Sequence, residues 1–375
     1  MFGVYFHIPF CRKACSYCNF HFSTNLNGTG KMAEAISKEI GLTNLPEKGM
    51  KTLYFGGGTP SLLQKEELGL IFSSLRSKTE FSELEEVTLE CNPEDINVHS
   101  IEYWKNLGIT RLSIGLQSLN ESELRAMNRA HNDAQSFECL DLLGQFGYFN
   151  ISVDLIYGTP WKSNSQWEEE LDFIIGHKAI SHISAYALTV ESKTQLNHQI
   201  NKGEIPPIDD DRTVSQFNIL QEKIHQNNWE AYEISNYCKP NHRAKHNSQY
   251  WKFRPYFGFG PAAHSFDGKT TRYLNIANNT LYIQSIQKEE LPREYEELSL
   301  TDSLNERIMT GLRTCEGIRT VDLENFIPGW EKRNIRALNR YIKSGDLVQL
   351  NHGYQLTHSG KLISDRIISD LMEID

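Results

Sequence analysis

In the stretch Tyr5-Phe-His-Ile-Pro-Phe-Cys11-Arg-Lys-Ala-Cys15-Ser-Tyr-Cys18, a short apolar run leads directly into three closely spaced cysteines. The spacing Cys-x3-Cys-x2-Cys lets one short loop wrap three thiolates around a single metal centre. The spacing alone leaves two kinds of centre open. A zinc ion needs a fourth ligand, which His21 could supply, whereas a four-iron cluster would keep one iron free for an outside donor.

The composition describes a folded protein with more than one domain. At about 150 residues per domain, a chain of 375 residues predicts two or three domains. Its 16 Tyr, 18 Phe and 6 Trp residues are too many for a solvated coil, which excludes a disordered chain. The formal net charge of −10 argues against bulk binding of nucleic acid.

The sequence predicts a reducing compartment and no membrane span. No apolar run approaches the ~18–20 residues that cross a bilayer. The segment Met1–Phe10 is apolar but has no basic start and no small-residue cleavage site, so we expect no signal peptide. An odd number of cysteines then favours free thiols in the cytoplasm over a disulfide framework. The four scattered cysteines, which we expect to be small buried hydrophobes, are Cys91, Cys139, Cys238 and Cys315.

Short apolar runs alternate with amphipathic stretches over residues 1–235. The runs that predict strands are Val4–Ile8, Thr52–Phe55, Glu86–Cys91, Arg111–Ile114, Ile151–Ile156 and His182–Ala187. Helical periodicity follows several of them, for example over Lys31–Leu42 and Ala134–Phe146. Six successive βα units predict a parallel sheet with helices outside. At this length the pattern favours a partial or full barrel of the TIM type over an open doubly wound sheet.

The remaining residues divide into two parts. Residues 236–290 read as a loop-like, aromatic-rich connecting segment. Within Gln287–Glu297, a charged stretch around Pro292 indicates a boundary or an exposed helix. Residues 291–375 then predict helix, helix, hairpin and helix, which suggests a small winged-helix-like α+β domain.

Polar residues stand at the ends of several predicted strands. The loop Gly56-Gly-Gly-Thr-Pro60 follows the second strand, Glu90 ends the third, Gln117 follows the fourth and Asp154 lies within the fifth. The carboxyl ends of parallel barrel strands meet at one mouth, so these groups should converge there with the cysteine loop. The glycine loop lacks the Gly-Lys-Ser/Thr of a Walker A motif, so it predicts either a bare backbone edge for a ligand or a tight turn.

A second motif, His246-Asn-x-x-Tyr250-Trp251, joins a possible metal ligand to two aromatic rings. These residues could bind a flat macrocycle such as heme, or the rings could simply plug the barrel. On chemical grounds His7, His242 and His264 are equally available as ligands.

Three motifs together resemble the coproporphyrinogen-dehydrogenase-like branch of the radical S-adenosylmethionine (SAM) superfamily. They are Tyr5-x-His-Ile-Pro-Phe-Cys11-x3-Cys15-x-Tyr17-Cys18, the Gly-Gly-Gly-Thr-Pro loop and His246-Asn-x-x-Tyr250-Trp251. The resemblance extends over essentially the whole chain, including the C-terminal domain. It implies the radical SAM type of partial barrel, and an iron–sulfur cluster rather than zinc.

The resemblance also implies roles for individual residues. Cys11, Cys15 and Cys18 would hold a [4Fe–4S] cluster whose open iron takes the amino and carboxylate groups of SAM. The residues that match the SAM pocket of the family are Tyr5, Tyr17, Gly57, Gly58, Thr59, Glu90, Gln117, Arg129 and Asp154. Reductive cleavage of SAM would yield methionine and a 5′-deoxyadenosyl radical, with the cofactors carrying the chemistry. The resemblance leaves catalytic residues of the chain itself undefined.

Two departures separate the chain from the dehydrogenase. That enzyme continues its motif as Cys-x-Cys, whereas Phe20 follows Cys18-Asn19 here, and only ten residues precede Cys11 where the dehydrogenase has a longer arm. Both features are similar to the HemW-type heme chaperones, which bind heme and deliver it to respiratory enzymes.

The resemblance therefore implies a heme chaperone that uses a [4Fe–4S] cluster and SAM and contacts heme through His246, Tyr250 and Trp251. Its expected partners are heme, recipient heme apoproteins of the respiratory chain and an electron donor, in the cytoplasm or peripherally at the inner face of the membrane. One alternative is a coproporphyrinogen III dehydrogenase that decarboxylates porphyrinogen propionates. The other is a nucleic-acid-binding regulator, which the mixed charge of Lys332–Asp375 disfavours.

Overall fold

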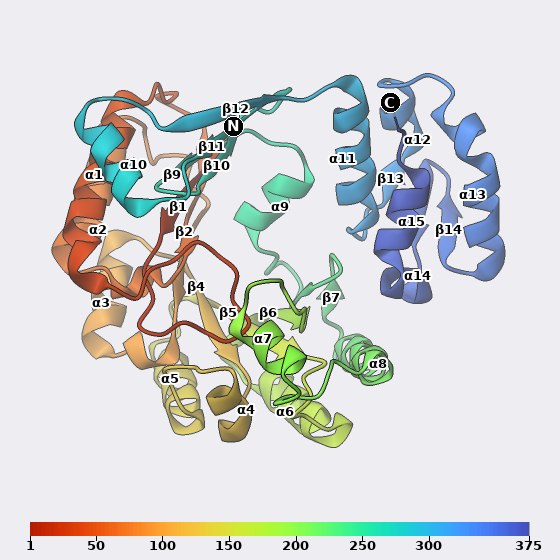
Figure 1. The fold of residues 1–375 in the computed structure, drawn as a ribbon, viewed down its shortest axis with the longest axis horizontal. Coiled ribbons are helices and arrows are strands. Elements are labelled where there is room, and N and C mark those ends of the chain that lie inside the picture. Colours follow the sequence, from red (N-terminus) through yellow and green to blue (C-terminus); the bar gives the residue numbers. More distant parts are fainter. Residues whose placement is uncertain (375) are drawn as a thin grey trace.

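A twelve-stranded sheet forms the scaffold of the computed structural model, which describes residues 1–374 (Figure 1). Its central strands are parallel and adjacent in sequence order, each joined to the next by a helical crossover. They are β1 (Phe2–Ile8), β2 (Met50–Gly57), β3 (Glu86–Cys91), β4 (Arg111–Gln117), β5 (Asn150–Tyr157) and β6 (Ile180–Ala187). The sheet ends at the edge strands β12 (Arg293–Glu297) and β7 (Glu230–Ala231), so the expected partial (βα)6 barrel is confirmed.

Amphipathic helices connect and cover these strands. They are α1 (Thr29–Leu42), α2 (Lys65–Arg76), α3 (Val98–Leu107), α4 (Glu121–Ala126), α5 (Asp133–Phe146), α6 (Asn164–Gly176), α7 (Gln195–Asn201) and α8 (Asp210–Gln226). Helix α1 buries Met32, Ile36 and Ile40 on one stripe. Helix α5 starts at an Asn132 capping box and stops at Gly147, whose φ of 58° lies in the left-handed region that ends helices.

Residues 236–290 do not form the expected loop-like connection, because together with Arg293–Glu297 they extend the barrel sheet. These segments contain β8 (Asn236–Cys238), α9 (Lys245–Trp251), β9 (Tyr256–Phe259), β10 (His264–Phe266), β11 (Thr271–Asn275), α10 (Asn279–Gln287) and β12. Strand β9 pairs in parallel with β1, and one continuous apolar core extends from Phe2 to Ile286. The charged stretch around Pro292 is not an exposed helix, because Arg293–Glu297 is an edge strand, where charged side chains remain in water.

A second unit follows β12 and lies beside the barrel, next to α9 (Figure 1). It consists of α11 (Leu300–Leu312), β13 (Ile318–Arg319), α12 (Thr320–Glu324), α13 (Trp330–Ser344), β14 (Leu347–Leu350), β15 (Gly353–Leu356), α14 (His358–Leu362) and α15 (Ser364–Leu371). Trp330, Leu338 and Ile367 are fully buried in a separate core. The order helix, strand, two helices, hairpin confirms the expected winged-helix-like α+β unit.

Within residues 1–374, no helix is both long enough and apolar enough to cross a bilayer.

Candidate functional site

The cysteine loop leaves β1, crosses the mouth of the barrel and rests on the segment that follows α4. The Ser16 amide donates to the carbonyl oxygen of Met127 (3.1 Å), and Asn128 Nδ2 donates to that of Ala14 (2.8 Å). At its start, the Cys11 amide donates to the carbonyl oxygen of Ser23 (3.0 Å). The protein chain therefore supports the loop at several points along its length.

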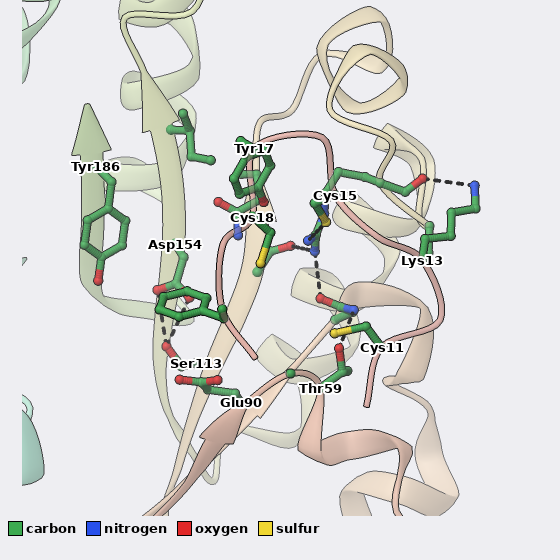
Figure 2. A pocket seen from close by; sticks show the side chains of 18 of the residues that line it. Cys11, Lys13, Cys15, Tyr17, Cys18, Thr59, Glu90, Ser113, Asp154 and Tyr186 are labelled. Atoms are coloured by element: carbon green, nitrogen blue, oxygen red, sulfur yellow. Dashed lines mark hydrogen bonds between the residues drawn. The ribbon is translucent and has the colours of Figure 1, made fainter. Parts of the chain in front are cut away.

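The three cysteine sulfurs line one cavity of about 370 Å³, which we call the first cavity (Figure 2). Among the described residues, no three His, Cys, Asp or Glu side chains surround a point at which one metal ion would bind. A four-iron cluster binds each thiolate on a different iron, so its ligands stand farther apart than those of one zinc ion. His21 bonds to Asn279 and does not line this cavity, so the arrangement fits the cluster and not the Cys3His zinc set.

The thiols are shielded from water and lie beside one cation. Burial raises the pKa of Cys11 to about 11 and also raises the pKa of Cys18, so both are neutral thiols when no metal is bound. Arg129 Nη1 donates to Cys15 Sγ at 3.2 Å. Iron is ligated by thiolates, and the positive charge of Arg129 lies where it would offset part of their negative charge.

The glycine loop at the end of β2 packs directly against the base of the cysteine loop. The Gly58 amide donates to the Ile8 carbonyl oxygen (2.9 Å), and the Thr59 amide donates to that of Phe10 (2.7 Å). Gly57 has a φ of 106°, and a Cβ at this position would lie 2.7 Å from the His7 ring. The loop therefore needs glycine both for its backbone conformation and for the close approach, and it also presents bare backbone to the first cavity.

Two carboxylates face the first cavity from the barrel strands, opposite Cys11 and Cys15 (Figure 2). Glu90 accepts hydrogen bonds from Tyr54 Oη (2.6 Å) and from the Gly57 amide (3.2 Å), and burial raises the pKa of Glu90 to about 7. Asp154 accepts from Ser113 Oγ (3.2 Å), and burial raises the pKa of Asp154 to about 6. Among the described residues neither carboxylate has an ion-pair partner, so both suit a ligand that brings its own positive charge or hydroxyl groups.

Arg129 reaches the same cavity from the segment after α4. Its Nη2 donates to Asn92 Oδ1 and to the Gly115 carbonyl oxygen, both at 2.7 Å. Its Nε is buried and has no partner among the described residues. That unpartnered donor at the cavity wall fits a carboxylate of a bound ligand.

Gln117 and Tyr17 complete the set of predicted residues in the first cavity. Gln117 ends β4 next to an irregularity in its pairing with β5 and has a φ of 65°, a conformation that costs energy for a residue with a side chain. Tyr17 lies in the cysteine loop, and burial raises its pKa. The loop, the strand ends and Arg129 therefore converge at one mouth, as the barrel argument required.

A larger cavity of about 750 Å³ adjoins the first one; we call it the second cavity. Phe20, Gly57 and Glu90 line both cavities, so the two cavities are adjacent and share part of their walls. The wall carries aromatic rings, three histidines and two arginines, and helix α11 of the C-terminal unit closes one side. Its lining residues include Phe20, Tyr250, Trp251, Phe253, Tyr256, Phe266, His7, His21, His264, Arg254, Arg272 and Met309. Sites for small molecules have this size and apolar character.

Tyr5 and His246 do not lie in the cavities where the sequence predicts them. Tyr5 lines the second cavity, not the first, and its ring stacks on Tyr54. His246 is 2% exposed and does not line either cavity. Its Nδ1 bonds with Thr52 Oγ1 and its Nε2 with Tyr250 Oη, both at 2.8 Å, so no ring nitrogen faces a ligand. Tyr250 and Trp251 of the same motif do line the second cavity.

Several lining residues of the first cavity were missed from sequence. Asn92 holds Arg129, Ser113 holds Asp154, and Tyr186 lies across from Cys18 at the end of β6. Each of these residues follows a predicted strand, ends one, or alternates with the apolar residues of one. The alternation of side chains that face the inside of the barrel could therefore have identified them.

Comparison with known proteins reveals similarity over the whole chain. Residues 5–174 match the model of the radical SAM superfamily. Heme chaperone HemW of Bacillus subtilis is 29% identical over 98% of this chain and 98% of its own length. Heme chaperone HemW of Synechocystis sp. is 31% identical, covering 89% of this chain and 83% of its own. The mitochondrial radical S-adenosyl methionine domain-containing protein 1 of Danio rerio is 30% identical over 94% and 80%.

A solved structure shares the fold. Coproporphyrinogen III oxidase (HemN) of Escherichia coli, described as a radical SAM enzyme, superposes with a TM-score of 0.83 at 20% identity, covering 99% of this chain and 90% of its own. A partial barrel with three loop cysteines and a glycine loop at its mouth is thus the scaffold of a radical SAM protein. This chain belongs to the radical SAM superfamily and is similar over nearly its whole length to the HemW-type heme chaperones. Membership implies a [4Fe–4S] cluster and SAM as cofactors.

Proposed function

We propose that this chain is a heme chaperone that binds heme in the second cavity and passes it to heme-requiring apoproteins. The observation that carries the proposal is a large, aromatic-walled cavity that shares Phe20, Gly57 and Glu90 with the first cavity. Aromatic walls suit a flat macrocycle, because ring stacking adds to simple apolar burial. The relatives named heme chaperone HemW support the same assignment.

The cofactors belong in the first cavity under this proposal. Cys11, Cys15 and Cys18 ligate the [4Fe–4S] cluster, which when bound supplies the electron for reductive cleavage of SAM. The unpartnered Nε of Arg129 suits the SAM carboxylate, and the carboxylate of Glu90 suits a cationic group of SAM.

The other predicted residues shape the space around SAM. Gly57, Gly58 and Thr59 let SAM lie against bare backbone, while Tyr17, Gln117 and Asp154 form the remaining walls. Tyr5 affects the SAM site indirectly, because its ring stacks on Tyr54, whose hydroxyl donates a hydrogen bond to Glu90.

On the heme side, Tyr250 and Trp251 are direct contacts, and His246 anchors Tyr250 through its Nε2. The recipients are heme apoproteins, including enzymes of the respiratory chain, and an electron donor serves the cluster. Delivery to such recipients places the chaperone in the cytoplasm, with peripheral contact at the inner face of the membrane.

The second candidate is a coproporphyrinogen III dehydrogenase. It is favoured by a tetrapyrrole-sized cavity directly beside the SAM residues. Phe20 is evidence against this function, because the dehydrogenase has a cysteine at the position of its cluster motif that corresponds to Phe20.

One experiment separates the two. Anaerobically reconstituted protein receives SAM, a reductant and coproporphyrinogen III, and a parallel sample is titrated with hemin. Saturable, one-to-one uptake of hemin without porphyrinogen turnover is the expected result. Stoichiometric formation of protoporphyrinogen would instead establish the dehydrogenase and refute the chaperone. Iron and sulfide analysis of the same sample tests the cluster, and one zinc per chain without iron would contradict it.

A further inference from the structure

The second cavity contains several side chains that could ligate a heme iron. The nitrogen and sulfur candidates in its wall are His7, His21, His264 and Met309. A side chain can ligate iron only through an atom with a free lone pair. The hydrogen bonds that each candidate side chain already makes therefore decide which of them is available to the iron.

Most of the histidines nearby are already engaged. His7 Nε2 donates to the His21 carbonyl oxygen (2.9 Å), and its Nδ1 accepts from Tyr5 Oη (3.3 Å). The two ring nitrogens of His246 bond with Thr52 and Tyr250. Using either imidazole as a ligand would break a hydrogen bond inside the protein, and such a loss is costly for a buried group.

His21 is held through its Nε2 by Asn279 Oδ1 (2.7 Å), so among the three cavity histidines of the described residues only the ring of His264 has no partner. His264 stands at the start of β10, is exposed, and lines the cavity on the same strand as Phe266. Within residues 1–374 its ring has no hydrogen-bond or ion-pair partner, so both nitrogens are free. Partial desolvation at the cavity wall and the nearby charge of Arg272 lower the pKa of His264, which favours the neutral imidazole that binds iron.

The cavity also provides a place for the heme carboxylates. Arg272 forms a two-pronged ion pair with Glu306, which occupies its guanidinium. Arg254 is exposed at the cavity wall, and among the described residues its guanidinium has no ion pair. A free guanidinium is well suited to a propionate, because it can donate two parallel hydrogen bonds.

We infer that the heme iron is ligated by the imidazole of His264 and that Arg254 binds a heme propionate. This inference rests on the proposed function. His246, from the motif singled out in the sequence, then acts as a positioning residue: it supports Tyr250 in the cavity wall and does not touch the iron.

The test is an anaerobic hemin titration of the reconstituted full-length protein, followed by absorption and resonance Raman spectroscopy. We expect His264→Gly to lose the iron–imidazole signature and to bind hemin about tenfold or more weakly. Added free imidazole should restore the signature, since glycine leaves room for it. His264 is exposed, so the thermal unfolding midpoint should remain near that of the unsubstituted protein.

Matched variants distinguish the other ligands. His242→Ala, which removes a histidine outside both cavities, should leave the spectrum unchanged, and so should His21→Ala and Met309→Leu. His246→Ala should keep the iron–imidazole signature while weakening hemin binding a few-fold. If His264→Gly keeps the signature and another of these variants loses it, the assignment of His264 is wrong.

The propionate contact has its own probe. We expect the unsubstituted protein to bind hemin several-fold more tightly than hemin dimethyl ester, and Arg254→Gln to bind both equally. Lys252→Gln is the matched control, because Lys252 is an exposed cation outside the second cavity. If Arg254→Gln retains the preference for free carboxylates, Arg254 is not the contact. If the unsubstituted protein takes up no hemin at all, the proposed function itself fails, which is a different outcome from either.

Discussion

A Cβ atom on Gly58 would lie 2.6 Å from the carbonyl oxygen of Phe10, the residue immediately before Cys11. It would also lie 2.8 Å from the Ile8 carbonyl oxygen, which accepts the Gly58 amide hydrogen bond. Both neighbours are backbone atoms and cannot turn aside as a side chain would. The glycine loop and the cysteine loop are therefore built as one unit, and the smallest side chain at position 58 must displace the start of the cysteine loop.

We accordingly expect Gly58→Ala to lower the iron and sulfide content per chain after reconstitution, and to destabilise the fold by about 1–3 kcal/mol. The control is Gly41→Ala on α1, where a Cβ would meet nothing within 4 Å. That substitution should retain full iron content and stabilise the fold by roughly 0.5–1 kcal/mol, as alanine favours a helix. Equal iron content in both variants would show that the loops are not coupled.

Glu90 should make SAM binding depend on pH. Burial raises the pKa of Glu90 to about 7, and the ionised carboxylate is the form that attracts a cationic group. SAM affinity, measured by anaerobic calorimetry, should therefore be constant above about pH 8 and fall by up to about tenfold per pH unit below 7. Glu90→Gln should bind SAM roughly 10–100-fold more weakly and lose this step. Asp154→Asn should keep the step, because Glu90 remains, but should move its midpoint to lower pH, because the negative charge of Asp154 contributes to the raised pKa of Glu90.

The Glu90 carboxyl should also make the free energy of unfolding depend on pH. The direction is opposite to that of SAM affinity, since stability should fall as pH rises. The pKa of Glu90 is raised in the folded state, so the folded chain holds the proton more tightly between pH 4.5 and about 7, and stability falls as pH rises through this window. Without SAM, Glu90→Gln should then be more stable than the unsubstituted protein at pH 8 by an amount on the order of 1 kcal/mol, and near-equal at pH 4.5. A loss of stability at pH 8 would mean that the carboxylate is stabilised by the barrel interior.

Tyr54 should shift the pH at which Glu90 titrates. Its hydroxyl donates to Glu90 Oε1 at 2.6 Å and thereby lowers the pKa of Glu90 against the effect of burial. Tyr54→Phe should raise the midpoint of the pH dependence of SAM affinity by about one unit, since a hydrogen bond to a charged group contributes about 1.5 kcal/mol. At pH 9 or above, affinity should approach that of the unsubstituted protein. Tyr103→Phe, which removes a hydroxyl that bonds to the Lys65 carbonyl oxygen, should leave the midpoint unchanged.

The barrel could be predicted because its signals are local. Each parallel strand is a run of apolar residues, and the polar residue at its end reaches the mouth through the barrel geometry alone. Glu90 and Asp154 were therefore identified correctly as neighbours of the cysteine loop without any knowledge of packing.

The segment after residue 235 could not be predicted in the same way. Strand β9 is only four residues long and pairs with β1, more than 250 positions away, where Gly3 lies opposite Tyr256. The orientation of His246 likewise depends on Thr52, which is 194 positions away and supplies one of its hydrogen bonds. A motif indicates which side chains are present, but only packing decides which of them face the cavity.

Phe20 should contribute to heme binding without contributing to the cluster. Its ring is 68% exposed and lines both cavities, so it is available to a flat ligand rather than committed to the core. Phe20→Ala should weaken hemin binding by about 3–10-fold, the usual range for one lost aromatic contact, and leave the iron content of the cluster unchanged. Phe173→Ala, which removes a 38% exposed ring of α6 that lines neither cavity, should change neither. Unchanged hemin affinity in Phe20→Ala would place heme outside the second cavity, whereas a loss of iron would assign the ring to the cysteine loop instead.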